Sequence, residues 1–174
     1  MPKVLVPLAQ GCEEMEAVTI IDILRRAEFT VVTAGLDAHP VRASRGTVLV
    51  PDMTLDKALE QDYDMVVLPG GLPGTDHLDA DPRIHGILKK MANSGKFAGA
   101  ICAAPKVLAR AGLLDGKKAT AYPGVLDQMA LKNVTCSGEA VVRDGKIITS
   151  RGPGTAMDFA LAIVEMLAGH ATKD

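Results

Sequence analysis

The chain has 174 residues, of which 48% are hydrophobic and 23% charged, and a formal net charge of −2. This length suits one domain with a sizeable core, so we expect a single domain over residues 1–174. Only 3% of the residues are aromatic and charges of both signs are interspersed. This composition excludes a base-stacking platform and a basic patch for nucleic acid.

The sequence shows no segment typical of membrane insertion, secretion or zinc binding. No apolar run reaches the ~18 residues that a membrane-spanning helix needs. The opening MPKVLVPLAQG is too short and too strand-like for a signal peptide. The cysteines at 12, 102 and 136 form no C-x-x-C pair, which argues against a zinc site or a disulfide framework. We therefore expect a cytoplasmic protein with reduced thiols.

The first two thirds of the chain alternate between strand and helix patterns. Apolar runs predict strands at 3–9, 29–35, 65–71 and 97–101, with short strand material at 41–50. Helical patterns are found at 13–27, 54–60 and 82–93. This order predicts an α/β fold in which helices cover both faces of a mostly parallel sheet.

The last third begins with shorter elements. A strand is expected in KKATAY (117–122), a helix at 125–132 and two strands within 140–149. Asp144-Gly145 is expected to join those two strands in a type I′ turn. A final helix is expected from the TAMD segment at 155–158 to Leu167.

Cys102 lies where a predicted strand turns into a predicted helix. One interpretation is a small residue filling a tight corner, since free cysteines are often buried. The other is a nucleophile elbow, in which unpaired N–H groups at the helix start lower the thiol pKa. Small neighbours suit the sharp turn, and N–H groups of Ala103 and of Gly70-Gly71 could hold an oxyanion. We favour the reactive interpretation for Cys102, and we interpret Cys12 and Cys136 as small buried residues.

Glu16 falls inside the apolar arc when residues 13–27 are placed on a helical wheel. Negative charge in the first turn of a helix is favourable, which would explain Glu13, Glu14 and Glu16 together. A carboxylic acid with a raised pKa, aimed into the crevice at the strand ends, would explain the inward position. Both explanations stay open on the wheel alone. Met15 and Val18 lie on the outward side, where they suggest contact with another subunit.

Four segments together resemble the ThiJ/PfpI superfamily, and within it the parkinsonism-associated deglycase branch with its bacterial ThiJ-like relatives. They are GCEEMEAVTIIDILRRA, VVLPGG, AICAAP and SRGPGTAMDFALAIVEML, in the family's order over nearly the whole chain. The resemblance implies a three-layer flavodoxin-like sandwich, a homodimer, and no metal or organic cofactor.

The resemblance also implies roles for individual residues. The family's reactive cysteine falls on Cys102 and its protonated glutamate on Glu16. The oxyanion-type backbone donors fall on Gly71 and Ala103, and an arginine that reaches the partner subunit's site falls on Arg45.

Two departures from the family pattern affect the expected chemistry. Ala103 stands where the protease-like branch has a histidine, which makes a peptidase unlikely on the resemblance. Tyr122 stands where many close relatives have a histidine, and tyrosine is a poor general base at neutral pH. Tyr122 and Gly70 are expected to contact substrate rather than to move protons.

The residues and the resemblance together predict a cysteine-dependent, glutathione-independent glyoxalase or deglycase acting on α-oxoaldehydes such as methylglyoxal or on their early adducts. The alternative is an oxidative-stress sensor or redox-regulated chaperone that works through oxidation of Cys102. A structural or partner-binding domain is a third interpretation. The expected partners are the small-molecule substrate and a second copy of the chain.

Overall fold

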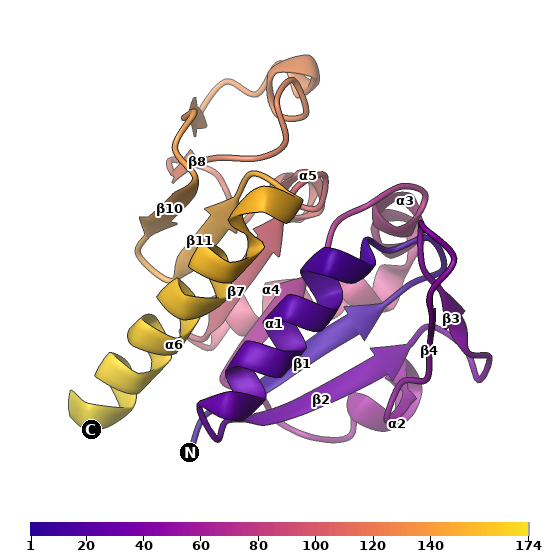
Figure 1. Cartoon of the computed structure of the whole chain (residues 1–174). Coiled ribbons are helices and arrows are strands. Elements are labelled where there is room, and N and C mark those ends of the chain that lie inside the picture. Colours follow the sequence, from indigo (N-terminus) through magenta and orange to yellow (C-terminus); the bar gives the residue numbers. More distant parts are fainter. Residues whose placement is uncertain (174) are drawn as a thin grey trace.

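A computed structural model describes residues 1–173 and shows a sheet between two layers of helices (Figure 1). One apolar cluster joins the sheet to α1 and α6, and a second joins its other face to α2, α3, α4 and α5. The predicted three-layer α/β sandwich is therefore confirmed.

The central sheet has seven strands in the order β10-β11-β7-β6-β1-β2-β5. All neighbouring pairs are parallel except β10 with β11. The strands are β1 (Lys3–Leu8), β2 (Thr30–Gly35), β5 (Met53–Thr54), β6 (Met65–Leu68), β7 (Phe97–Ile101), β10 (Val141–Asp144) and β11 (Ile147–Ser150). Two small two-stranded sheets pair β3 (Val41–Arg42) with β4 (Val48–Leu49) and β8 (Lys118–Ala119) with β9 (Thr135–Cys136).

Six α-helices and two short 3₁₀ turns connect the strands within residues 1–173. They are α1 (Glu14–Arg26), α2 (Leu55–Ala58), α3 (Gly74–Ala80), α4 (Pro82–Asn93), α5 (Pro105–Arg110), α6 (Ala156–Lys173), η1 (Asp127–Met129) and η2 (Pro153–Thr155). Within these residues, no helix combines the length and the apolar character needed to cross a membrane.

The order of the strands shows where the predicted crevice lies in the sheet. β1 lies between β2 and β6, so the chain first builds outward in one direction from β1 and then in the other. The carboxyl ends of parallel strands at such a reversal form the usual ligand crevice of open α/β sheets. β1, β6 and β7 are neighbours, which confirms that the segments after these three strands meet at one edge.

Local signals explain the helix boundaries that were predicted well. The Asp81 side chain accepts the Arg83 N–H at 2.9 Å, and Pro82 occupies the first helical position of α4. Glu13 caps α1 by accepting the Met15 N–H at 3.0 Å. Both helices therefore begin within a residue of the prediction.

Several local predictions were wrong. The helix expected at 125–132 is only the three-residue 3₁₀ helix η1. The loop between β10 and β11 is Gly145-Lys146, with positive φ only at Gly145, so it fits a type II′ turn and not a type I′ turn at Asp144-Gly145. The final helix continues past Gly169 to Lys173 instead of ending at Leu167. The sequence patterns also missed α3, whose seven residues are too few to show helical periodicity.

Candidate active site

Cys102 occupies a strained corner immediately after β7. Its φ is 65°, in the left-handed region that non-glycine residues rarely adopt. Its N–H donates to the Ser150 carbonyl at 3.0 Å, and its own carbonyl accepts the Tyr122 N–H at 2.8 Å. These two bonds hold the corner, and the predicted nucleophile elbow is confirmed as a backbone feature.

Glu16 lies on the buried face of α1, with its side chain 0% exposed. Its Oε1 accepts the Gly70 N–H at 2.9 Å, while Oε2 is buried without a hydrogen bond to any described residue. Burial raises the pKa of Glu16 to about 7, although the Gly70 N–H and the Cys102 thiol oppose that shift. The structure thus supports the second explanation for Glu16, a carboxylic acid that keeps its proton near neutral pH.

The expected low pKa of Cys102 is contradicted. Burial and the neighbouring Glu16 carboxylate raise the pKa of the Cys102 thiol to about 12. The predicted helix start is also misplaced, because α5 begins at Pro105, three residues after the cysteine, and has only six residues. Its dipole is therefore short and begins away from the sulfur, while burial and like charge dominate.

Two backbone donors act in the opposite direction on the thiol. The N–H groups of Gly71 and Ala103 both lower the pKa of Cys102 by stabilising negative charge on sulfur. These are the two donors that the resemblance implied. When Glu16 is protonated, its charge no longer opposes the thiolate, so one negative charge can be shared between the two groups. The arrangement can move a proton between Glu16 and a reactant while the N–H groups hold an anion.

Close packing of glycines fixes this geometry. A Cβ atom at Gly70 would lie 2.6 Å from the Cβ of Cys102 and 2.8 Å from Oε1 of Glu16. Gly71 has a φ of +91°, and a Cβ there would lie 2.5 Å from the Glu13 nitrogen. Only glycine therefore lets the segment after β6 approach both reactive side chains.

Glu14 organises the turn that carries Arg45. Its carboxylate accepts the N–H groups of Arg45 at 3.0 Å and Thr47 at 3.2 Å, and the Ser44 hydroxyl at 3.1 Å. Arg45 itself is exposed. The structure brings Cys102, Glu16, Gly70, Gly71, Ala103 and the main chain of Tyr122 together, and it places Arg45 on the separate β3–β4 turn.

One contributor to the site was missed by sequence reasoning. Ser150, the last residue of β11, is buried and accepts the Cys102 N–H through its carbonyl. Its hydroxyl shares a 2.7 Å hydrogen bond with Thr155 and donates to the Ala140 carbonyl at 2.7 Å. The SRGPG segment after a predicted strand was the available signal, because it marks a fourth strand end at the crevice.

The other cysteines differ from one another. Cys12 is buried as predicted, and burial together with Glu14 and Glu13 raises its pKa to about 12. Cys136 is exposed, so its interpretation as a buried residue was wrong. Within the described part of the chain, no three His, Cys, Asp or Glu side chains are grouped to hold a metal ion.

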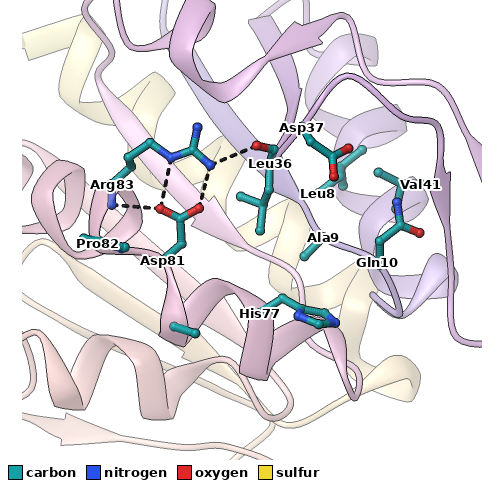
Figure 2. Close-up of a pocket in the computed structure, with 11 residues that line it drawn as sticks. Leu8, Ala9, Gln10, Leu36, Asp37, Val41, His77, Asp81, Pro82 and Arg83 are labelled. Atoms are coloured by element: carbon teal, nitrogen blue, oxygen red, sulfur yellow. Dashed lines mark hydrogen bonds and ion pairs between the residues drawn. The ribbon is translucent and has the colours of Figure 1, made fainter.

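A separate pocket of about 510 Å³ opens beyond the ends of β1 and β2 (Figure 2). Its lining includes Gln10, His77 and Arg83, but neither Cys102 nor Glu16. The Arg83 guanidinium is held by Asp81 and by the Leu36 carbonyl at 2.9 Å. This pocket is distinct from the elbow.

Comparison with known proteins identifies relatives of the chain. Residues 2–166 match the model of the DJ-1/PfpI family. The chain is 49% identical to protein DJ-1 homolog B of Arabidopsis thaliana, over 97% of this chain but only 39% of that protein's length. It is 38% identical to the glutathione-independent glyoxalase DJR-1.2 of Caenorhabditis elegans, over 92% of this chain and 85% of that protein.

Solved structures agree with the sequence comparison. Drosophila melanogaster DJ-1beta superposes with a TM-score of 0.92 at 43% identity, covering 97% of this chain and 91% of that one. A structure of Toxoplasma gondii DJ-1 described as oxidized superposes with a TM-score of 0.91 at 41% identity, covering 96% and 91%. Since the family model matches residues 2–166 of the 174 and the elbow is in place, the chain belongs to the DJ-1/PfpI family.

Proposed function

We propose that the protein is a cysteine-dependent, glutathione-independent glyoxalase that converts α-oxoaldehydes such as methylglyoxal to 2-hydroxy acids. The observation that carries this proposal is the pairing of Cys102 with a buried Glu16 whose pKa is about 7. The name of the Caenorhabditis elegans relative supports the same reaction class.

The proposed reaction needs no external oxidant. The Cys102 sulfur attacks the aldehyde carbon, the C=O bond opens, and the thiol proton ends on the new hydroxyl of a hemithioacetal. Glu16 takes the hydrogen on that carbon as a proton, and the ketone oxygen gains a proton to give an enediol. Glu16 then returns its proton to the former ketone carbon while the hydroxyl on the sulfur-bearing carbon loses its own proton, which produces the thioester of the 2-hydroxy acid. Water then splits the thioester to release the 2-hydroxy acid and the Cys102 thiol. The N–H groups of Gly71 and Ala103 stabilise the developing oxyanion.

The same site would accept early glyoxal adducts of amines and thiols, because these adducts release the free aldehyde reversibly. Deglycase activity would then be hydrolysis of an adduct through the same Cys102 intermediate. Gly70 and Tyr122 are proposed to contact the substrate. Peptidase chemistry is disfavoured, since Ala103 offers no imidazole beside the nucleophile.

We further propose a homodimer in which the outward face of α1 meets a second copy. Met15 and Val18 on α1 are 59% and 44% exposed, and Met157 and Leu161 on the neighbouring α6 are 61% and 53% exposed. Arg45 would then act at the partner's site. The free cysteines suit a reducing compartment such as the cytoplasm.

A redox role for Cys102 is the second candidate, and the partly accessible sulfur and the oxidized Toxoplasma gondii relative favour it. Peroxide would transfer one oxygen to the sulfur and leave as water, and a second peroxide would give the sulfinic acid. The thiolate is the reactive form in both candidate functions, so the raised pKa of Cys102 slows oxidation and nucleophilic attack alike.

The deciding experiment is conversion of methylglyoxal to lactate without glutathione by the wild type, Cys102→Ala and Glu16→Gln. We expect turnover in the wild type, none with Cys102→Ala, and a loss of kcat of roughly 10²–10⁴-fold with Glu16→Gln. No wild-type turnover, together with a mass gain of two oxygens on Cys102 under mild peroxide, would support the redox role instead.

A further inference from the structure

Tyr122 is an exposed aromatic residue whose main chain is bonded to the reactive cysteine. Its N–H donates to the Cys102 carbonyl at 2.8 Å, so the main chain of Tyr122 is fixed to the elbow. The ring lies near Gly152, where an added Cβ would meet its Cδ2 at 3.7 Å. Gly152 has no side chain to cover the ring, and Tyr122 remains 54% exposed.

Leu72 belongs to a second segment that is tied to the same cysteine. It directly follows Gly71, whose N–H acts on the Cys102 sulfur, and it is 59% exposed. Single exposed apolar side chains are common on protein surfaces and need no explanation. These two are different, because each belongs to a segment hydrogen-bonded to Cys102.

The polar groups near the sulfur disfavour an anionic substrate. Glu13 and Glu16 both come from the first turn of α1, and Glu13 raises the pKa of Glu16 through its negative charge. Within one subunit, a carboxylate or a phosphate on the substrate would meet the same repulsion, and only an Arg45 guanidinium supplied by a second copy would oppose it. Within residues 1–173, no hydrogen bond of the Tyr122 hydroxyl is present, which leaves both the ring face and the hydroxyl for a ligand.

We propose that Tyr122 and Leu72 form a specificity surface that selects α-oxoaldehydes whose ketone carbon carries a flat, uncharged apolar group. The aldehyde carbon would meet the Cys102 sulfur, and the apolar group would lie against the Tyr122 ring and the Leu72 side chain. Phenylglyoxal is a probe of this class, and methylglyoxal is the small reference. The inference rests on the proposed function, since it concerns the substrate of the same site.

The test is the ratio of kcat/KM for phenylglyoxal to kcat/KM for methylglyoxal. Stacking and burial of an aryl group predict a wild-type ratio of roughly ten. We expect Tyr122→Ala to reduce the ratio to near one and Leu72→Ala to reduce it by about threefold. Tyr122→Phe is the matched control, because it keeps the ring and should keep the ratio.

The outcomes separate this inference from the function itself. Methylglyoxal turnover with a wild-type ratio of one or less, or a ratio unchanged in Tyr122→Ala, would overturn the specificity surface and leave the glyoxalase intact. If neither aldehyde is turned over, the glyoxalase fails. Binding of the unreactive ketones acetophenone and acetone, followed by saturation-transfer NMR, then decides the specificity surface. A signal from acetophenone that exceeds the acetone signal and disappears in Tyr122→Ala supports it, and any other pattern overturns it.

Discussion

The first turn of α1 holds two glutamates, two residues apart, in opposite environments. Glu16 faces the sheet and is fully buried, and burial raises its pKa to about 7. Glu14 faces the β3–β4 turn. Desolvation raises the pKa of Glu14, but hydrogen bonds from backbone N–H groups, including those of Thr47 and Arg45, outweigh it and lower the pKa to about 2.

The difference shows that burial and the number of N–H donors together decide the charge of each carboxylate. Glu16 has one backbone donor and an unsatisfied oxygen, so the neutral acid is favoured. Glu14 has several donors, so the anion is favoured and the turn is held in place. One residue supplies a transferable proton, and its neighbour supplies a permanent charge that organises a loop.

The largest expected effect on stability and turnover comes from disturbing the buried surroundings of Glu16. Gly70→Ala would place a methyl group 2.6 Å from the Cβ of Cys102 and from the Ile101 carbonyl. We expect the free energy of unfolding to fall by about 3 kcal/mol and methylglyoxal turnover to be lost. Urea unfolding and the lactate assay measure the two effects. Gly86→Ala, where an added Cβ meets nothing within 4 Å, is the control. Full activity in Gly70→Ala would contradict the described geometry.

The next effect concerns the pH dependence that Glu16 gives to stability. Folded Glu16 keeps its proton up to about pH 7, whereas the unfolded chain releases it near the ordinary value of 4.5. The folded state therefore holds an extra proton between these values, and raising the pH destabilises it by about 3 kcal/mol. In Glu16→Gln, the free energy of unfolding measured in urea should no longer fall as the pH rises from 4 to 8. An unchanged slope would show that Glu16 is ionised when folded.

The smallest effect is the pH dependence of stability that comes from Glu14, and it has the opposite sign. Folded Glu14 stays charged down to about pH 2, whereas the unfolded chain binds a proton near 4.5. Stability from Glu14 is present above pH 4.5 and is lost as the pH falls toward 2. Glu14→Gln should reduce this loss of stability at acid pH. The reduction should be only a fraction of the Glu16 effect, because Glu14 is partly exposed. If Glu14→Gln instead removed the pH dependence between pH 4.5 and 7, the titrations of the two carboxylates would be coupled.

Periodicity and turn chemistry were enough to predict much of the fold and two positions of the site. The inward position of Glu16 followed from the wheel, and the corner at Cys102 followed from small residues between a strand and a helix. The pKa of Cys102 could not be predicted, because it depends on burial and on contact with Glu16, which is 86 positions away in the sequence. The hydrogen bond from the Arg45 N–H to Glu14 could not be predicted either, because Arg45 lies in a turn whose contacts follow no periodicity.

The left-handed backbone at Cys102 has a consequence for how this position can vary. A non-glycine residue in that conformation costs about 1–2 kcal/mol, whereas glycine would adopt it without strain and lose about 1 kcal/mol to the entropy of its unfolded chain. On backbone conformation alone, glycine would therefore be at least as stable as cysteine at 102, and only the packing of the Cys102 side chain against the apolar cluster favours cysteine. The backbone gives no preference for the thiol, so a cysteine that persists there across descendants reports selection on its side chain.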